Sequence, residues 1–331
     1  MNFLSKTSFQ VLLICLGLGI LSCKNQQKEA EPKKAAAEEQ VRKDPFFKLS
    51  LAEWSLHRQI FDKKLDPMHF AKKANEMGFE GLEYVSAFYQ DHYKNAENQE
   101  EAFQKMLDTL KAESDKYNIR NVLIMVDEEG DLAVSDETER NKAVENHKKW
   151  IDAAEYLGAH SIRVNLFGSP EAEEWKKNAA DALKKLAEYA QPKGVNVLVE
   201  NHGYLSSNAK LLTEVMEMVN MPNVGTLPDF GNFCLKREGG ERWEAQCVEE
   251  YPRYKGVREM MPYAKAVSAK SYDFNKEGEE TTIDYGRILE IVKEAGYGGF
   301  IGVEYEGDSL SEEKGIMATK ELLIKEGSKL N

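Results

Sequence analysis

The 331-residue sequence lacks an excess of positive charge, because 44 Lys and Arg residues face 57 Asp and Glu residues and the formal net charge is −13. This balance argues against nucleic acid or an anionic membrane surface as the main partner, since both attract basic proteins. A divalent cation is not excluded, because it binds carboxylates. The sequence also lacks a Gly-rich phosphate-binding fingerprint after its first predicted strand and a short-period repeat. These absences argue against a Rossmann fold and a solenoid.

Apolar runs long enough to span a bilayer are also lacking, since the run at 9–21 falls short of the ~20 residues that a spanning helix needs. Lys6 precedes this run, and Ile20-Leu21-Ser22-Cys23 ends it in a pattern that resembles a bacterial lipobox. We therefore expect a signal peptide at 1–22 and a lipidated Cys23. An uncleaved anchor and an ordinary signal peptide are the alternatives. The expected location is exported, on a bacterial membrane, with membrane contact through the acyl chains alone.

Cysteine is scarce, with four residues in the whole chain. Cys15 leaves with the predicted signal and Cys23 carries the lipid, so Cys234 and Cys247 remain. An exported protein permits a disulfide between them, and two free thiols are the alternative. Residues 23–44 lack aromatic side chains and are rich in Lys, Glu, Ala and Gln, which predicts a flexible tether. We expect one folded domain at 45–331.

Within 45–331, short apolar runs alternate with longer amphipathic segments. The expected strands are 47–53, 81–85, 120–126, 160–165, 195–200, 224–227, 266–270 and 300–304. Helix signals lie between them, such as Asp136 followed by Glu139 at the start of a segment that Gly158 ends. Repeated strand–helix units imply parallel strands, and eight of them at this length favour a closed (β/α)₈ barrel in the α/β class.

Reactive groups in such barrels lie at the carboxyl ends of the strands. Glu200, Asp229 and Glu304 each follow an apolar run there, so we expect them to converge at the barrel mouth. Three converging carboxylates repel one another, and a divalent cation such as Mn²⁺ or Mg²⁺ would hold them ionised. The alternative is a structural network in which Arg163 and Lys270 neutralise the acids.

Other strand ends supply candidate substrate contacts, namely Trp54, His57, Arg163, Asn165, His202 and Asn232. Trp54 and His57 suit sugar stacking and hydroxyl recognition, and His202 suits a ligand, a donor or a proton carrier. Lys270 suits binding a substrate oxygen or stabilising an enolate. Each of these residues has a packing or charge-balancing alternative. We expect the segment at 127–130 to be a solvated loop, and Tyr84 and Tyr305 to pack.

Four segments carry a family resemblance. The motifs GVNVLVENH (194–202), LPDFGN (227–232), VSAK (267–270) and GFIGVE (299–304) resemble the xylose isomerase-like barrels, a group of sugar phosphate isomerases and epimerases that includes endonuclease IV relatives. The similarity extends over 45–331. It implies that Glu200 and Glu304 bind a metal and shuttle the substrate proton, and that Asp229 is a further ligand.

The sequence departs from the family pattern at two positions. Ser268 stands where the family commonly has a histidine ligand, and Asn232 stands where it often has histidine. No histidine follows His202 in the chain, so a fourth ligand would be a weaker group, water, His202 or His57. Lys270 keeps its place in the family pattern.

We therefore expect a divalent-metal-dependent isomerase or epimerase that acts through an enediolate on a small keto or aldo sugar. An exported protein meets glycosides and oxidised sugars, so a 3-keto-glycoside lyase or hydratase is the near alternative. A carbohydrate-binding lipoprotein without catalysis is another, which the missing histidine supports and the acidic trio opposes. Phosphodiester cleavage is disfavoured by the net charge, the predicted export and the few histidines.

Overall fold

The computed structural model describes residues 44–243 and 245–331. The predicted signal peptide, Cys23 and nearly all of the predicted tether lie outside the described residues. Eight strands form one sheet in which every ladder is parallel. They are β1 (Lys48–Ala52), β2 (Gly81–Val85), β3 (Arg120–Met125), β4 (Ser161–Val164), β5 (Asn196–Glu200), β6 (Val224–Leu227), β9 (Val267–Ser271) and β10 (Phe300–Tyr305). Each overlaps one strand expected from the sequence.

The sheet curls until its two edge strands, β6 and β9, meet. Isolated parallel bridges join Thr226 to Ala264 and Asp229 to Ser268 across this edge. The Ser268 N–H donates to the Pro228 carbonyl, and the Ser268 carbonyl accepts from the Phe230 N–H, both at 3.0 Å. These contacts close the ring, so the expected (β/α)₈ barrel is confirmed.

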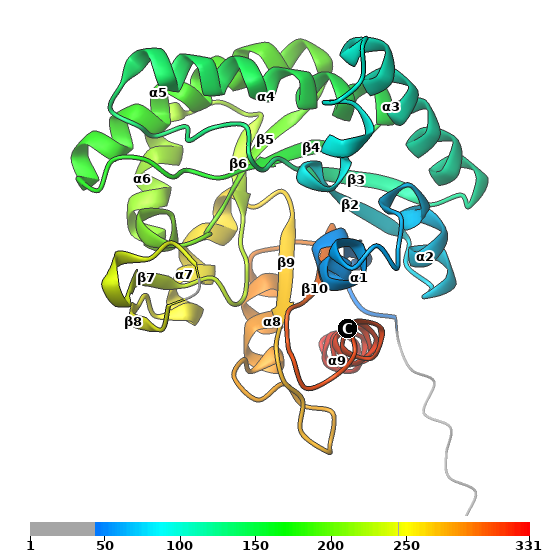
Figure 1. Cartoon of the computed structure of the whole chain (residues 1–331). Coiled ribbons are helices and arrows are strands. Elements are labelled where there is room, and N and C mark those ends of the chain that lie inside the picture. Colours follow the sequence, from blue (N-terminus) through cyan, green and yellow to red (C-terminus); the bar gives the residue numbers. More distant parts are fainter. Residues whose placement is uncertain (1–43, 244) are drawn as a thin grey trace, which may run out of the picture. The chain divides into compact units, whose positions relative to one another are not determined.

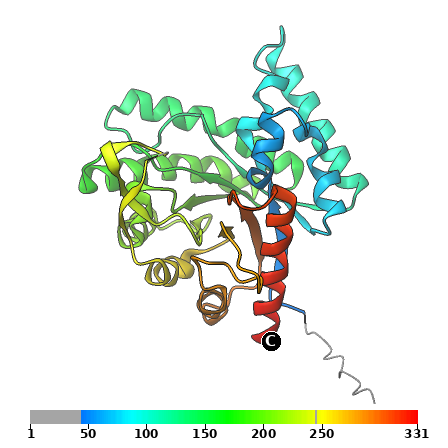
Figure 2. The same cartoon turned by 60° about the horizontal axis from the view of Figure 1, so that its bottom comes forward.

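The helices lie around the outside of the strands (Figures 1 and 2). They are α1 (His57–Phe61), α2 (Phe70–Glu76), α3 (Gln99–Lys116), α4 (Glu137–Leu157), α5 (Ala172–Ala190), α6 (Ala209–Val219), α7 (Arg253–Met260), α8 (Tyr285–Glu294) and α9 (Glu312–Lys329). As expected, Asp136 caps α4 by accepting from the Glu139 N–H. Gly158 ends α4 in the left-handed conformation, at φ 74°. Within 44–243 and 245–331, no helix combines the length and apolar character that crossing a membrane requires.

Burial of the apolar strand residues against this helical ring holds the barrel together. Leu51, Leu82, Val197 and Ile301 have no exposed surface, and they belong to one continuous core. Complete burial of each such side chain stabilises the fold by about 1.5–3 kcal/mol. The expected packing roles of Tyr84 and Tyr305 are confirmed, since both rings are buried in this core.

A two-stranded hairpin interrupts the strand–helix alternation between β6 and α7. Its strands, β7 (Cys234–Arg237) and β8 (Cys247–Glu250), pair in antiparallel fashion and form a separate sheet. A disulfide joins Cys234 to Cys247, which settles the choice that the sequence left open. Because the hairpin follows a barrel strand, it lies on the carboxyl-end face, where Figure 2 shows it in yellow.

Candidate active site

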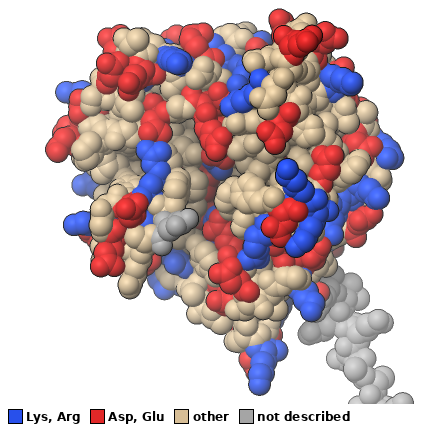
Figure 3. All heavy atoms as spheres, in the orientation of Figure 1, with Lys and Arg blue, Asp and Glu red and all other residues tan. Residues whose placement is uncertain are grey.

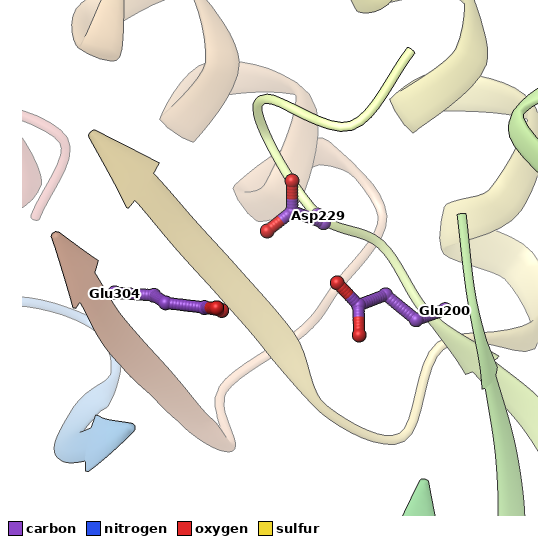
Figure 4. A group of neighbouring side chains, drawn as sticks. All are labelled: Glu200, Asp229 and Glu304. Atoms are coloured by element: carbon purple, nitrogen blue, oxygen red, sulfur yellow. The ribbon is translucent and has the colours of Figure 1, made fainter. Parts of the chain in front are cut away.

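Three buried carboxylates meet at the mouth of the barrel (Figure 4). Glu200 ends β5, Asp229 follows β6 and Glu304 lies in β10. One oxygen from each lies within 4.8 Å of the others. The three side chains therefore come together as expected from their positions at strand ends, although they are far apart in the chain.

Asp229 and Asn232 are fixed by the tight loop after β6. Asp229 Oδ1 accepts from the N–H groups of Gly231, at 2.8 Å, and Asn232, at 2.7 Å. The side chain of Asn232 donates to Glu200 Oε1 at 3.0 Å. Asn232 thus connects two of the three acids through hydrogen bonds. Its expected contact with substrate stays a prediction.

Ser268 fills the position of the absent histidine and lies between two carboxylates. Its Oγ is 2.7 Å from Asp229 Oδ2 and 2.8 Å from Glu304 Oε2. A hydroxyl carries one proton, so it can donate to one of these oxygens and not to both. One buried carboxylate oxygen is therefore left without this donor.

Arg163 and Lys270 supply the positive charge around the acids. Arg163 Nε is 2.8 Å from Glu200 Oε2, yet the two atoms are misaligned for a hydrogen bond and, among the described residues, neither has another partner. Lys270 Nζ is 2.8 Å from Glu304 Oε1 and 3.0 Å from Glu306 Oε1. The structural ion-pair network considered from the sequence is thus present beside the acidic trio.

Arg163 and Lys270 do not satisfy all the carboxylate oxygens of the trio. Glu200 Oε2 is buried without a hydrogen bond, and Ser268 leaves either Asp229 Oδ2 or Glu304 Oε2 unsatisfied. Unsatisfied buried oxygens are costly, and hard divalent cations prefer such oxygen ligands. Glu200, Asp229 and Glu304 therefore fit a divalent cation.

Burial and mutual repulsion shift the pKa values of the three acids. Burial, with repulsion from Glu304, raises the pKa of Glu200 to about 8 despite the Arg163 charge. Burial likewise raises the pKa of Asp229 to about 6. Burial would also raise the pKa of Glu304, but Lys270, Ser268 and Arg163 together outweigh burial and hold this pKa below its usual range. The site thus opposes the gathering of three negative charges unless a cation is added.

Asp127 corrects the expectation of a solvated loop after β3. Its Oδ1 accepts from Arg163 at 2.8 Å and from Asn165 Nδ2 at 2.7 Å. Burial would raise its pKa, but Arg163, His202 and Asn165 together outweigh burial and lower it. Asp127 is half-buried, and Glu129 in the same segment is buried and accepts from Trp150. Asp127 belongs to the site because it forms an ion pair with Arg163, which is far away in the chain.

His202 lies beside this group, with Nδ1 2.7 Å from Asn165 Oδ1. Burial, aided by Arg163, lowers the pKa of His202 to about 3. The ring is therefore neutral at physiological pH, which argues against the proton-carrier role considered from the sequence. Its capacity to donate to or accept from a substrate is unchanged.

Trp54 and Glu306 form the opposite side of the site. The indole N–H of Trp54 donates to Glu306 Oε1 at 2.6 Å, and the ring stacks on His57 at 4.8 Å. His57 is not among the described residues that line the cavity, so its expected contact with substrate gains no support. The Glu306 carboxylate instead reaches the site, which its place two residues past Glu304 could have indicated.

A large cavity opens above the acids. Its volume is about 1100 Å³, and Trp54, Arg163, Asn165, His202, Asn232 and Glu304 are among the residues that line it. Glu200 and Asp229 do not line the cavity themselves, but both accept hydrogen bonds from Asn232, which does. Figure 3 shows a hollow on this face, with acidic atoms gathered around it. A small polar molecule in the cavity can therefore reach Glu304, the member of the trio that lines it.

Solved structures with the same fold were found by comparison. A D-tagatose 3-epimerase-like protein is 19% identical, with a TM-score of 0.63 over 86% of this chain and 100% of that chain. The IolI protein, solved with a zinc atom, is 17% identical, with a TM-score of 0.62 over 86% and 99% of the two chains. The 3-keto-D-glucoside 4-epimerase YcjR from E. coli is 14% identical, with a TM-score of 0.60 over 78% and 94%. No curated protein sequence matches the chain.

The fold and the strand-end carboxylates define a (β/α)₈ barrel with an acidic pocket that could hold a metal ion. Residues 71–327 match the family described as the xylose isomerase-like TIM barrel. The chain belongs to this family, as the resemblance of its strand-end motifs predicted.

Proposed function

We propose that this protein is a divalent-metal-dependent enzyme that moves a proton next to the carbonyl group of a sugar, as an isomerase or epimerase. The observation that carries the proposal is the meeting of Glu200, Asp229 and Glu304 beneath an open cavity, where the buried Glu200 Oε2 has no hydrogen-bond donor among the described residues. The similar structures, which include sugar epimerases and a zinc-bound protein, support it.

Glu200 and Glu304 are suited to the two proton transfers. Their carboxylates face each other across the barrel mouth in Figure 4, so a sugar carbon between them presents one face to each. One carboxylate removes the proton while the C–H electron pair moves toward the carbonyl oxygen. Return of a proton from the other side inverts that carbon, whereas return to the neighbouring carbon gives an isomer. A divalent cation bound to the three acids would supply Lewis-acid polarisation of the carbonyl.

Lys270 and Arg163 prepare the two carboxylates for these roles. The Lys270 ammonium keeps Glu304 ionised and thus able to accept a proton. Arg163 lies against Glu200 while it also binds Asp127. Lys270 is therefore proposed as a catalytic residue that also binds a substrate oxygen, and Arg163, Asn165 and His202 as substrate contacts at the cavity wall.

A 3-keto-glycoside lyase or hydratase is the second candidate. The same α-proton removal expels a β-oxygen substituent when one is present, and addition of water gives the hydrated product. Two observations favour it: Ser268 replaces the histidine of the family pattern, and the cavity is larger than a single sugar requires. The 3-keto-D-glucoside epimerase among the similar structures supports this substrate class.

The test is hydrogen exchange at the α-carbon in D₂O, with free ketoses and 3-keto-glucosides as substrates and with or without Mn²⁺. We expect Mn²⁺-dependent deuterium incorporation that falls by about 10²- to 10⁴-fold in Glu200→Gln and Glu304→Gln. Glu97→Gln is the matched control, because Glu97 is an exposed acid that does not line the cavity. A protein that binds sugar without metal or exchange would instead be a carbohydrate-binding protein.

We also propose that the protein is exported and anchored through a lipid on Cys23. The charged and apolar pattern of residues 1–23 supports export, and so does the Cys234–Cys247 disulfide, since such bonds persist in oxidising compartments. Incorporation of labelled palmitate that is lost in Cys23→Ser would support the anchor. Unlabelled full-length protein in a lipoprotein-producing host would refute it.

A further inference from the structure

The tip of the β7–β8 hairpin rests on the rim of the cavity. Arg242 pairs with Asp131 at 2.9 Å, and its guanidinium lies over the Phe167 ring at 4.4 Å. Trp243 approaches His202, with ring centroids 4.8 Å apart, and Phe167, with centroids 5.3 Å apart. The hairpin, which the sequence did not predict, therefore adds an aromatic wall to the barrel mouth.

This wall presents apolar surface to the cavity rather than to the core. Trp243 is 45% exposed and lines the cavity, as does Phe61, which is 62% exposed. Phe61 belongs to a second aromatic group with Trp54 and Phe88, contributed by residues after β1 and β2. Exposed aromatic surface that lines a pocket marks a site that is covered by a ligand.

The size of the cavity indicates what the ligand is. Pockets of about 300–1000 Å³ enclose whole drug-sized molecules, and this cavity measures about 1100 Å³. A single sugar bound at Glu304 would leave the space beside Trp243 unfilled. The rim beside Trp243 also offers charged hydrogen-bond donors from Arg237 and Arg242, which both line the cavity.

We propose that Trp243 and Phe167 form a subsite for a second ring, so that the substrate is a glycoside whose first ring lies at the three carboxylates. The inference rests on the proposed function and names its substrate class. A ring attached at the anomeric oxygen stacks its apolar face on the Trp243 indole, and its polar edge faces Arg242. The Cys234–Cys247 disulfide holds the two strands that carry this wall.

The experiment compares probes that share one sugar and differ in the attached group. Methyl, 4-nitrophenyl and glucosyl glucosides, each in both anomeric forms, are titrated into the wild-type protein by calorimetry. We expect at least one ringed glucoside to bind about tenfold more tightly than its methyl counterpart. Trp243→Ala should remove that difference and leave the methyl glucoside unchanged, while Trp243→Phe should restore most of it.

Tyr156→Ala is the matched control, because Tyr156 is 41% exposed and lies on α4, outside the cavity. Equal affinity for methyl and ringed glucosides in the wild type would overturn the subsite, as would equal losses for both in Trp243→Ala or the absence of binding. A preference for the nitrophenyl over the glucosyl probe would assign the subsite to an aryl group, and the reverse to a sugar. These titrations require no turnover, so failure of the exchange assay would refute the proposed reaction and not the subsite.

Discussion

Glu53 is an ionisable residue whose surroundings in the folded protein disfavour its charged form. It is fully buried next to the barrel, and its carboxylate accepts from the Val85 N–H at 2.9 Å and the Tyr89 hydroxyl at 2.7 Å. Burial outweighs these bonds and raises the pKa of Glu53 to about 8. The folded protein therefore holds this side chain as a neutral acid below that pH.

Glu53→Gln should make the stability of the protein less sensitive to pH. The folded pKa of about 8 exceeds the ordinary value of 4.5, so the folded state binds this proton more tightly than the unfolded state does. The stabilisation is complete below pH 4.5 and is lost as the pH rises through 8, by at most about 1.4 kcal/mol per pH unit. Glutamine does not titrate and can still accept from Val85.

Urea unfolding at pH 5, 6.5 and 8 measures this effect. The free energy of unfolding should fall more steeply with pH in the wild type than in Glu53→Gln. Glu97→Gln, at an exposed position, should follow the wild type. Parallel curves for the wild type and Glu53→Gln would contradict the argument.

The strand-end acids and Asp127 differ in how well the sequence predicts them. Glu200, Asp229 and Glu304 follow buried apolar runs, so their positions at the barrel mouth depend on the strand assignment alone. Asp127 belongs to a charged run, which is typical of a wet loop. Its place in the site depends on the contact with Arg163, which is 36 residues away in the chain. The sequence pattern does not show this contact, because only the fold brings the two residues together.

At the scale of elements, the eight barrel strands were predictable and the hairpin was not. The barrel strands are short runs of buried Val, Leu and Ile between helix signals, and that pattern identifies parallel strands. β7 and β8 are half-buried to exposed, with the burial of their residues unrelated to any alternation in the sequence. Their pairing depends on the disulfide and on contacts with the rim.

Replacing both cysteines, in Cys234→Ser/Cys247→Ser, should loosen the hairpin and leave the barrel intact. The disulfide closes a loop with a sequence separation of 13, for which chain entropy predicts about 3 kcal/mol of stabilisation. Because the hairpin forms a separate sheet, that loss should fall on the hairpin.

Amide hydrogen exchange measures the opening of each element. Exchange in 234–250 should accelerate by about 100-fold in the double variant, whereas exchange in the strands of the barrel should not change. A comparable acceleration in β1 to β6 would show that the disulfide stabilises the whole domain. Protection equal to that of the wild type would show that the rim contacts suffice.

At the scale of the whole molecule, the proposed binding of a metal ion by the acidic trio would stabilise the folded state. A ligand that binds the folded state stabilises it by about 2.7 kcal/mol at 100 times its Kd. For a domain of this size, such a gain corresponds to an increase in Tm of about 5 °C or more. The three ligands come from three parts of the chain, so the unfolded protein cannot reproduce the site.

Thermal unfolding with and without Mn²⁺ measures this coupling, and a chelator should reverse the increase in Tm. Asp229→Asn should abolish the increase, because it removes a carboxylate from the trio. Asp152→Asn, which alters a carboxylate paired with Lys193 on the outer surface, should retain it. An equal increase in both variants would place the ion elsewhere.

The joint between β6 and β9 closes the ring, and it consists of isolated bridges rather than a continuous ladder. Asp229 and Ser268 form one of those bridges, and Ser268 also contacts Glu304. The contacts that close the barrel therefore also bring Asp229 close to Glu304. Without closure of the ring, the carboxylate cluster would not form. Loosening of this joint would therefore move Asp229 relative to Glu304 and disturb the carboxylate cluster.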